Sequence, residues 1–262
     1  MNTPDRTSPA SGRPLLRSEA PLQDRETFLS TFIRDRYRDE QYDAVYSGMS
    51  GVIFRSGHRM MERGISPEQN RDVFEFGGGG MPHFYWMDAT KMRRYTISDK
   101  LIDHRNRLAR LRAGMPSHIE LSLHDFDTDP GLSQAAGKYS RIIASHVLEH
   151  IPDPEAALVK WMSMLTDNGV LSIAIPCDPG WFWRLGQFVS YRSLRRQISF
   201  EEYDLLMSRE HLNPVQRILK ILRYYAPNCP AHWFPALVPV VDLNLICVVN
   251  VRKSATRNLP PN

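Results

Sequence analysis

Four consecutive glycines follow a short apolar run in the sequence DVFEFGGGGMPHF, residues 72–84. Glycine costs conformational entropy and contributes no packing, so four in a row within an ordered region call for a reason. A buried strand that ends in glycines and leads into a helix lets the backbone approach a nucleotide-like ligand closely. We therefore predict a ligand-binding loop here, and we keep a tight turn without a ligand as the alternative.

The two common phosphate-binding loops do not match this sequence. The dinucleotide fingerprint needs a third glycine, but that position is Pro82 when counted from Gly77 and His83 when counted from Gly78. A P-loop also needs Gly-Lys-Ser or Gly-Lys-Thr, and neither follows. A ligand without a pyrophosphate is therefore favoured.

S-adenosylmethionine fits the loop better, because it has no phosphate and carries two cationic groups that favour nearby acids. Glu75 lies inside the predicted strand, where a carboxylate is costly without a partner. Asp99 comes twenty residues after Gly79, at the end of the next strand. An acid at that position can bind the two ribose hydroxyls of an adenosine.

The sequence HVLEH, residues 146–150, also matches H-x-x-E-H, the inverted zinc-peptidase pattern. That chemistry needs both histidines on one face of a long helix. Pro152 and Pro154 follow at once, so a helix here is limited to about one turn. A zinc peptidase is therefore not predicted.

Three histidines remain candidates for a catalytic role: His146, His150 and His211. His146 ends a predicted strand at the carboxyl edge of the sheet, where ligands bind in open α/β folds. For His150, packing through a hydrogen bond is an equal alternative. His211 precedes a helix on the same side of the sheet, where it either faces the substrate or lies in a solvated loop.

Strands and helices alternate along the middle of the chain, which indicates a parallel sheet covered on both faces. Asp153 and Asn213 are predicted helix caps, because each is followed by proline at the first helical position. A weaker pattern suggests a short helix at 85–91. The strands are expected at 72–76, 93–99, 119–125, 140–146, 170–176 and 242–253, and the longer helices at 100–114, 154–169 and 213–225.

The composition divides the chain into four parts. The first part is rich in Pro, Ser and Arg and is expected to be disordered. The second shows a helical pattern, and the third holds the alternating strands together with an aromatic and arginine-rich insertion. The expected parts are a tail at 1–22, a helical cap at 23–66, the main domain at 67–253 with its insertion at 177–212, and a second tail at 254–262.

The sequence VFEFGGGG resembles motif I of class I S-adenosylmethionine-dependent methyltransferases. Residues 139–176, YSRIIASHVLEHIPDPEAALVKWMSMLTDNGVLSIAIP, are similar to motifs IV to VI of the small-molecule, type 11/12-like branch. The resemblance covers about residues 70–176. It implies an α/β, Rossmann-like fold with a mostly parallel seven-stranded sheet, helices on both faces and a C-terminal antiparallel strand, and S-adenosylmethionine as the cofactor.

The resemblance also implies a set of cofactor contacts around the methionyl group, the ribose, the adenine and the transferred methyl group. Two positions depart from the family pattern: Met81 replaces the usual third glycine, and Ser140 replaces an Asp that commonly opens the fourth strand. The expected contacts are Glu75, Phe76, Gly77, Gly78, Gly79, Asp99, Lys100, Asp125, Phe126, Ser145 and His146.

For the reaction we expect O-methylation without a metal, because a hydroxyl acceptor needs a base and histidine serves near neutral pH. N-methylation is the competing reaction, and a protein that keeps the fold but has lost catalysis is a further alternative. Ubiquinone-pathway O-methyltransferases, which this chain resembles, hold a divalent ion at positions that match His146, Glu149 and His150. We do not predict a metal here.

The acceptor is expected to lie between the N-terminal helices and the insertion at 177–212. One interpretation of the insertion is a lid, whose aromatic side chains cover the acceptor while its arginines bind an acidic group of the acceptor. A second interpretation is an amphipathic element that contacts a membrane, and a third is an inserted helix that packs in the core. The predicted acceptor-binding residues are Tyr46, Trp181, Trp183, Arg184, Tyr191 and Arg192.

The bulk properties limit the partners. The formal charge of +4 is mild, and no basic stripe indicates nucleic-acid binding. The three cysteines show no CxxC spacing, which fits a reducing compartment. Without an apolar leader or a long apolar segment, the protein is expected in the cytoplasm. We expect a small acceptor, acidic or lipid-linked, in bacterial natural-product or surface-glycan biosynthesis; membrane contact stays open, and the protein is a monomer or a homodimer.

Overall fold

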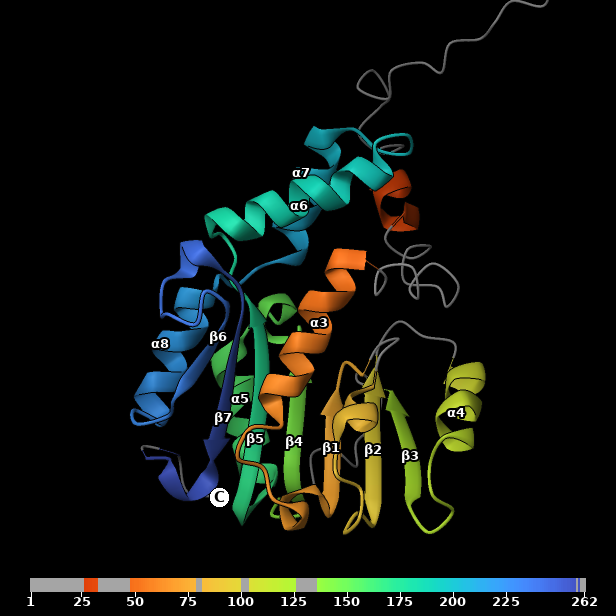
Figure 1. Cartoon of the computed structure of the whole chain (residues 1–262), viewed down its shortest axis with the longest axis vertical. Helices are drawn as coiled ribbons and strands as arrows, with labels where there is room; N and C mark the ends of the chain where they lie inside the picture. Colours follow the sequence, from red (N-terminus) through yellow and green to blue (C-terminus); the bar gives the residue numbers. More distant parts are fainter. Residues whose placement is uncertain are drawn as a thin grey trace, which may run out of the picture.

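Seven strands form one sheet in the order β3-β2-β1-β4-β5-β7-β6 (Figure 1). The computed structural model describes residues 26–32, 48–78, 82–99, 104–125, 136–257 and 259. The strands are β1 (Asp72–Phe76), β2 (Arg94–Asp99), β3 (Glu120–Asp125), β4 (Tyr139–Ser145), β5 (Leu165–Pro176), β6 (Ala231–Pro235) and β7 (Asn244–Arg252).

The five strands β1 to β5 pair in parallel, and β7 runs antiparallel to both β5 and β6. This arrangement confirms the predicted α/β, Rossmann-like fold with an antiparallel strand near the C-terminus. β6 was not among the strands that the sequence pattern identified. It is short and only partly buried, so its apolar pattern is weak.

Helices cover both faces of the sheet (Figure 1). The α3 and α4 side chains pack with Val73, Tyr95 and Ile97 on one face. The α5 and α8 side chains pack with Phe74 and Phe76 on the other face, as the alternation of side chains along a strand requires. The helices are α3 (Gly48–Met61), α4 (His104–Ala113), α5 (Pro154–Met164), α6 (Trp181–Leu194), α7 (Phe200–Glu210) and α8 (Val215–Tyr225).

Short 3-10 helices connect several of these elements: η2 (Pro67–Asn70), η3 (His83–Trp86), η5 (Leu148–His150), η6 (Val241–Leu243) and η7 (Lys253–Ala255). The weak helical pattern at 85–91 corresponds to η3, which begins and ends earlier. η5 has only three residues, so the H-x-x-E-H sequence does not lie on a long helix. This agrees with the two prolines that follow it.

Two predicted helix ends need correction. α5 ends at Met164, and the chain turns into β5 at Leu165 rather than continuing to Gly169. Asn213 does not cap α8, because its amide donates hydrogen bonds to the Leu148 and Ile151 carbonyl oxygens. By contrast, Asp153 caps α5 as predicted, since its Oδ1 accepts a hydrogen bond from the Ala156 N–H at 3.0 Å.

The structure describes only parts of the predicted segments at the two ends of the chain. The tail at 1–22 lies outside the described residues, and of the predicted cap only 26–32 and 48–66 are described. Within the latter range, α3 packs directly on the sheet, beside β5 and β7. Near the C-terminus we expected a tail from residue 254, but the Arg257 N–H donates to the Tyr225 carbonyl oxygen at 2.8 Å.

The insertion at 177–212 folds into α6 and α7, which lie above the carboxyl edge of the sheet (Figure 1). The segment at 26–32 packs on them through Leu29, which meets Ile198 and Tyr203 in a small apolar cluster. Among the described helices, none combines the length and hydrophobicity needed to span a bilayer.

Candidate functional site

The carboxyl ends of β1 and β4 lie side by side at the point where the strand order reverses. Open α/β sheets bind ligands at such a switch point, because the loops after the two strands separate there. Gly77 follows β1 with φ of 63°, and its N–H donates to the Ser98 carbonyl oxygen at 2.7 Å. A Cβ on Gly77 would come within 2.6 Å of the Val147 side chain, so this turn requires glycine.

Beneath this turn, Glu75 is 2% exposed on β1. Its carboxylate accepts hydrogen bonds from the His83 N–H, at 2.9 and 3.1 Å, and from the Tyr95 hydroxyl. Burial raises the pKa of Glu75 to about 7, although these hydrogen bonds act in the opposite direction. Glu75 therefore joins the two ends of the glycine loop from inside the protein, and a direct contact with a cofactor stays a prediction.

Two of the acids predicted for the cofactor site come from neighbouring strands. Asp99 ends β2 and Asp125 ends β3, and the two residues are paired in register. Asp99 is partly exposed at this edge, as a group that receives a ligand should be. Several predicted contacts lie outside the described residues: Gly79, Lys100, Phe126, the side chain of Asp125, and Tyr46 on the acceptor side; Met81 lies there too.

His146 comes directly after β4 and Ser145, beside the glycine turn. Its backbone has φ of 56°, which is uncommon for a residue other than glycine, and its N–H donates to the Ala174 carbonyl oxygen. The ring of Phe54 on α3 lies 4.7 Å from the His146 ring. α3 therefore covers this end of the crevice, and Phe54 is a site residue that the sequence analysis missed.

His150 and His211 are 61 positions apart in the sequence, yet their rings lie 5.1 Å from each other. The Nδ1 of His150 donates to the Glu210 carbonyl oxygen at 2.7 Å, because a carbonyl only accepts. The Nδ1 of His211 lies 2.8 Å from Asp178 Oδ2, just after β5. Asp178 was not predicted, although it lies two residues after the end of β5, at the same edge of the sheet as Asp99.

Glu149 lies among the three histidines and is 1% exposed. Its Oε1 is 3.4 Å from His146 Nδ1 and 3.8 Å from His150 Nε2. Within the described part of the chain, neither carboxylate oxygen has a hydrogen-bond partner, and the same holds for His146 Nε2 and Trp183 Nε1. Buried polar atoms without partners at one site indicate that a ligand, an ion or water completes it.

The histidines and carboxylates shift each other's pKa values. Burial alone would raise the pKa of Glu149, but the three histidines around it hold that pKa below its ordinary value. Burial would lower the pKa of His211, but Asp178, Glu149 and Glu210 raise it above 6.5. The site thus combines an ionised, buried carboxylate with a histidine of increased basicity.

Ligand atoms of Glu149, His150 and His211 lie within 4.8 Å of one another, so these three residues could hold a metal ion. This group shares Glu149 and His150 with the set that the sequence suggested, but His211 takes the place of His146. Divalent ions accept such mixed carboxylate and imidazole ligands.

The predicted acceptor-binding residues of α6 lie on different faces of that helix. The Trp183 ring is stacked on His211, with centroids 5.7 Å apart. Tyr191 packs against the apolar cluster of Leu29, Ile198 and Tyr203. Trp181, Arg184 and Arg192 are exposed, and helical geometry places them away from Trp183. Of the predicted set on α6, only Trp183 contacts the histidine group.

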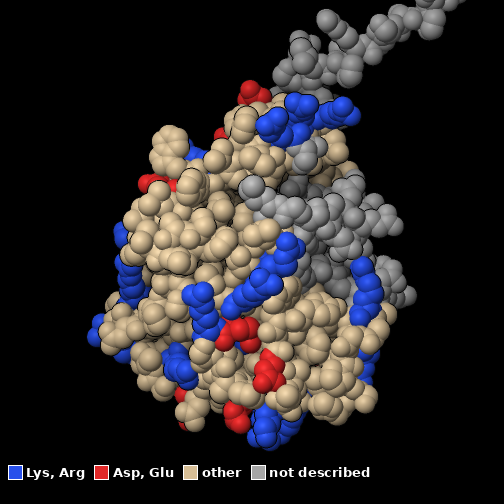
Figure 2. Space-filling model, viewed as in Figure 1, with Lys and Arg blue, Asp and Glu red and all other residues tan. Residues whose placement is uncertain are grey.

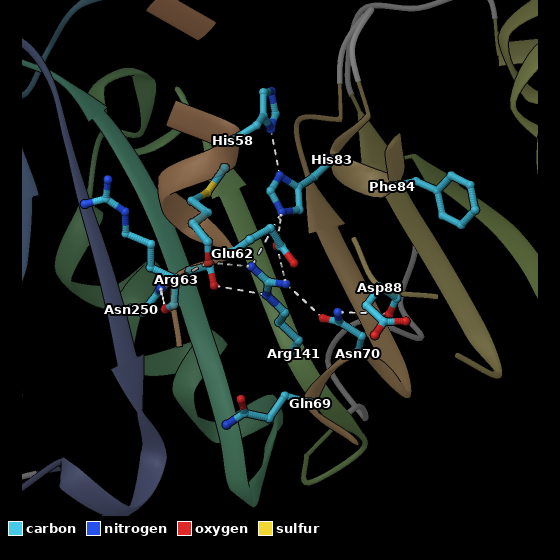
Figure 3. A network of polar contacts seen from close by, with 12 residues as sticks. His58, Glu62, Arg63, Gln69, Asn70, His83, Phe84, Asp88, Arg141 and Asn250 are labelled. Carbon is cyan, nitrogen blue, oxygen red and sulfur yellow. Dashed lines mark hydrogen bonds and ion pairs between the residues drawn. The ribbon is translucent and has the colours of Figure 1, made fainter. Parts of the chain in front are cut away.

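A buried ion-pair network supports the site from the amino end of β4 (Figure 3). Arg141 has no exposed surface, and its guanidinium lies 2.7 Å from Glu62 Oε1, just after α3. It also donates to Asn70 Oδ1 at 2.8 Å and to the Ser172 hydroxyl at 3.1 Å. Arg141 thereby joins α3, η2, β4 and β5, the elements around the crevice.

His83 links this network to the glycine loop (Figure 3). Its Nε2 lies 2.6 Å from Glu62 Oε1 and its Nδ1 lies 2.7 Å from His58 Nδ1. Burial lowers the pKa of His83 to about 4, so the ring is neutral at pH 7. His83 then donates to Glu62 and accepts from His58, whose own pKa burial holds well below 6.5.

Comparison with known proteins gives one family match. A family model described as a methyltransferase domain matches residues 38–220, which is more than half of the chain. This range includes the glycine loop, the strand ends and the histidine group. A search of curated protein sequences finds no significant match.

Solved structures with the same fold share little sequence with this chain. The 1,6-didemethyltoxoflavin-N1-methyltransferase of Burkholderia thailandensis, with bound 1,6-didemethyltoxoflavin and S-adenosylhomocysteine, has a TM-score of 0.53 at 14% identity, covering 90% of this chain and 91% of that chain. A possible histamine N-methyltransferase of Thermotoga maritima has a TM-score of 0.52 at 11% identity, covering 87% and 99%. The cyclase SpnF has a TM-score of 0.52 at 10% identity, covering 79% and 82%. These likenesses concern the fold, which supports more than one reaction.

Proposed function

Because the chain belongs to the class I S-adenosylmethionine-dependent methyltransferases, we propose that it methylates a hydroxyl oxygen of a small molecule, with His211 as the base. The observation that carries this proposal is the pair of His211 and Asp178, at 2.8 Å, beside the buried Glu149. N-methylation needs no such base, since an amine loses its proton readily. The cytoplasmic location and the biosynthetic role remain predictions.

The residues at the switch point fit the cofactor. Gly77 and Gly78 let the backbone turn tightly where a Cβ would collide with Val147 or Ile97, and Asp99 stands at the next strand end for the ribose. When bound, S-adenosylmethionine supplies an electrophilic methyl group. Ser145 and His146 would border that group, because Ser145 ends β4 and His146 follows it beside the glycine turn.

The remaining chemistry belongs to the chain's own side chains. With its Nδ1–H donated to Asp178, neutral His211 presents Nε2 as a proton acceptor. His211 Nε2 would take the proton of the acceptor's hydroxyl, whose oxygen would receive the methyl group as the bond from that carbon to the cofactor's sulfur breaks. Asp178 and Glu149 then stabilise the imidazolium that forms, since both are carboxylates close to it. Trp183, stacked on His211, helps to exclude water from this position.

The test is an acceptor screen with radiolabelled S-adenosylmethionine, followed by the pH dependence of kcat/KM on the hydroxyl acceptor found. The base must be neutral, so activity should rise with pH through a pKa above 6.5. His211→Gln should lower kcat/KM by about 10²- to 10⁴-fold and abolish this rise of kcat/KM with pH. Asp178→Asn should move the rise of kcat/KM to lower pH, because the carboxylate that raises the pKa of His211 is gone.

His118→Gln serves as the matched control, because His118 is an exposed histidine distant in sequence from the site. It should leave both the rate and the profile unchanged. Turnover of amines alone, or an unchanged profile in His211→Gln, would contradict the proposed reaction. Neither result would affect membership in the family.

A metal-assisted reaction is the second candidate, and the unpaired oxygens of Glu149 favour it. In that case EDTA would abolish turnover and magnesium or another divalent ion would restore it. With His211 as the base, turnover is expected to persist in EDTA. A protein without catalysis would bind S-adenosylhomocysteine but show no turnover with any acceptor.

A further inference from the structure

One face of α6 exposes large apolar side chains to solvent. Trp181 is 75% exposed and is accompanied by four apolar neighbours on the same face. Their spacing of one, four, seven and eight residues from Trp181 places all of them within one side of the helix. We call this surface the α6 face; its apolar members are Trp181, Phe182, Leu185, Phe188 and Val189.

Arginines complete the α6 face, and acids are absent from its sequence. Between Asp178 and Glu201 the chain carries four arginines and no Asp or Glu. All four are exposed, and no carboxylate of the described residues forms an ion pair with any of them. Figure 2 shows a group of Lys and Arg side chains where α6 ends and mainly uncharged side chains along the rest of it. The arginines are Arg184, Arg192, Arg195 and Arg196.

A second apolar segment adjoins the α6 face. In the loop that contains η6, Leu237 is 68% exposed with φ of 60°, and Val238, Val240 and Leu243 are also exposed. The Trp181 N–H donates to Asp242 Oδ1 at 3.2 Å, which attaches the start of α6 to this loop. The exposed apolar surface therefore continues from the helix into the loop.

The charge of this surface decides between the partners that could cover it. Two copies of the chain that met through the α6 face would bring four arginines against four, which opposes a symmetric dimer. A helix with arginines and bulky apolar side chains on its exposed face instead matches an interface with anionic lipids. The aromatic side chains would enter the headgroup region while the guanidinium groups contact phosphates.

We propose that the α6 face and the loop at 237–243 bind the surface of an anionic membrane. The proposed membrane binding does not depend on the proposed reaction, but it affects which acceptors reach the candidate site. Trp183 on the opposite side of α6 is stacked on His211, so the docked helix would connect the membrane surface to the candidate site. A lipid-linked acceptor would reach the candidate site from this membrane surface.

The test is sedimentation of the full-length protein with vesicles of phosphatidylcholine and phosphatidylglycerol in a 7:3 ratio, against vesicles of phosphatidylcholine alone. The protein should bind the anionic vesicles at low salt and lose at least tenfold in affinity at 0.5 M NaCl. The double variant Trp181→Ser/Phe188→Ser and the triple variant Arg192→Gln/Arg195→Gln/Arg196→Gln should each weaken binding at least tenfold.

Matched controls change exposed side chains elsewhere: Tyr224→Ser on α8, and Arg59→Gln/Lys160→Gln/Lys220→Gln. Both should bind as the unchanged protein does, and urea unfolding with all variants checks that they fold. The proposal is overturned if the unchanged protein does not bind anionic vesicles at low salt, or if the controls weaken binding as much as the α6 variants. It is also overturned if ultracentrifugation shows a dimer that the Trp181→Ser/Phe188→Ser variant dissociates, since a second copy would then cover the face.

Discussion

At the scale of single residues, buried carboxylates shape both the site and the stability of the protein. Glu75 and Glu149 are almost fully buried, yet their pKa values shift in opposite directions. Around Glu75 burial dominates, because its partners are neutral donors. Around Glu149 three histidines outweigh burial. The first carboxylate therefore costs stability when ionised, whereas the second remains ionised close to the proposed base.

This difference predicts how stability depends on pH through Glu75. Its folded-state pKa of about 7 lies above the ordinary 4.5, so the folded protein holds a proton that the unfolded chain releases between these values. The contribution is fully present below pH 4.5 and is lost as the pH rises through 7, by about 3 kcal/mol in all. Relative to the unchanged protein, Glu75→Gln should gain stability between pH 5 and pH 8.

Urea unfolding gives the free energy of unfolding of the unchanged protein and of Glu75→Gln at pH 5 and at pH 8. The gain is the amount by which the difference between the two proteins grows from pH 5 to pH 8. Other titrating groups contribute equally to both proteins and cancel in that difference. A constant difference across the range would show that Glu75 does not titrate there.

Asp99 allows a second prediction at the residue scale. If its carboxylate binds the ribose hydroxyls, Asp99→Ala should weaken S-adenosylhomocysteine binding by about 1.5–3 kcal/mol, because two buried hydroxyls lose a charged acceptor. Calorimetry measures the affinity, and Asp167→Ala is the control, since Asp167 is a fully exposed acid on β5. Equal affinities for the two variants would remove Asp99 from the cofactor site.

At the scale of elements, Arg141 joins four of them through a charge with no exposed surface. The ion pair of Arg141 and Glu62 is costly to break, because removing one partner leaves the other charge inside the protein without its counter-charge. The exposed pair of Arg94 and Glu120, at 3.5 Å between β2 and β3, forms a useful contrast. There water solvates either partner if the other is lost.

We therefore expect Arg141→Met to lower the free energy of unfolding by about 3–5 kcal/mol. Arg94→Met should lower it by less than about 1 kcal/mol, since an exposed ion pair contributes little. Urea unfolding at pH 7 measures both. Similar small losses in the two variants would mean that the elements around the crevice do not depend on Arg141.

At the scale of the whole molecule, cofactor binding and stability are coupled, because the switch point exists only when β1 and β4 lie side by side. S-adenosylhomocysteine at 100 times its Kd should stabilise the folded state by about 2.7 kcal/mol. For a protein of this size that corresponds to a rise in Tm of about 5–10 °C.

Thermal unfolding with increasing S-adenosylhomocysteine measures this shift, with NAD as the control ligand. The glycine loop lacks the dinucleotide fingerprint, so NAD should leave Tm unchanged. No shift with S-adenosylhomocysteine at millimolar concentration would contradict cofactor binding to this fold. An equal shift with NAD would contradict the specificity that we derive from the loop.

The sequence by itself determined the fold class and the place of the cofactor loop. Alternating strands and helices predict a parallel sheet, and the carboxyl ends of parallel strands meet at one edge whatever the details of packing. Gly77, Asp99 and His146 could be assigned to that edge because each directly follows or ends a predicted strand. Pro152 and Pro154 likewise excluded a long helix at HVLEH from local geometry alone.

Only the tertiary structure decided which side chains meet and which face solvent. His211 and Asp178 are 33 positions apart, and their contact depends on how α7 and the loop after β5 pack together. No local pattern encodes that packing. The same limit explains Asn213, which reads as a helix cap but binds η5 instead, and α6, whose aromatic and arginine residues look alike in sequence. Packing on the apolar cluster around Leu29 partly buries Tyr191, whereas Trp181 and Arg192, which face another side of the helix, remain exposed.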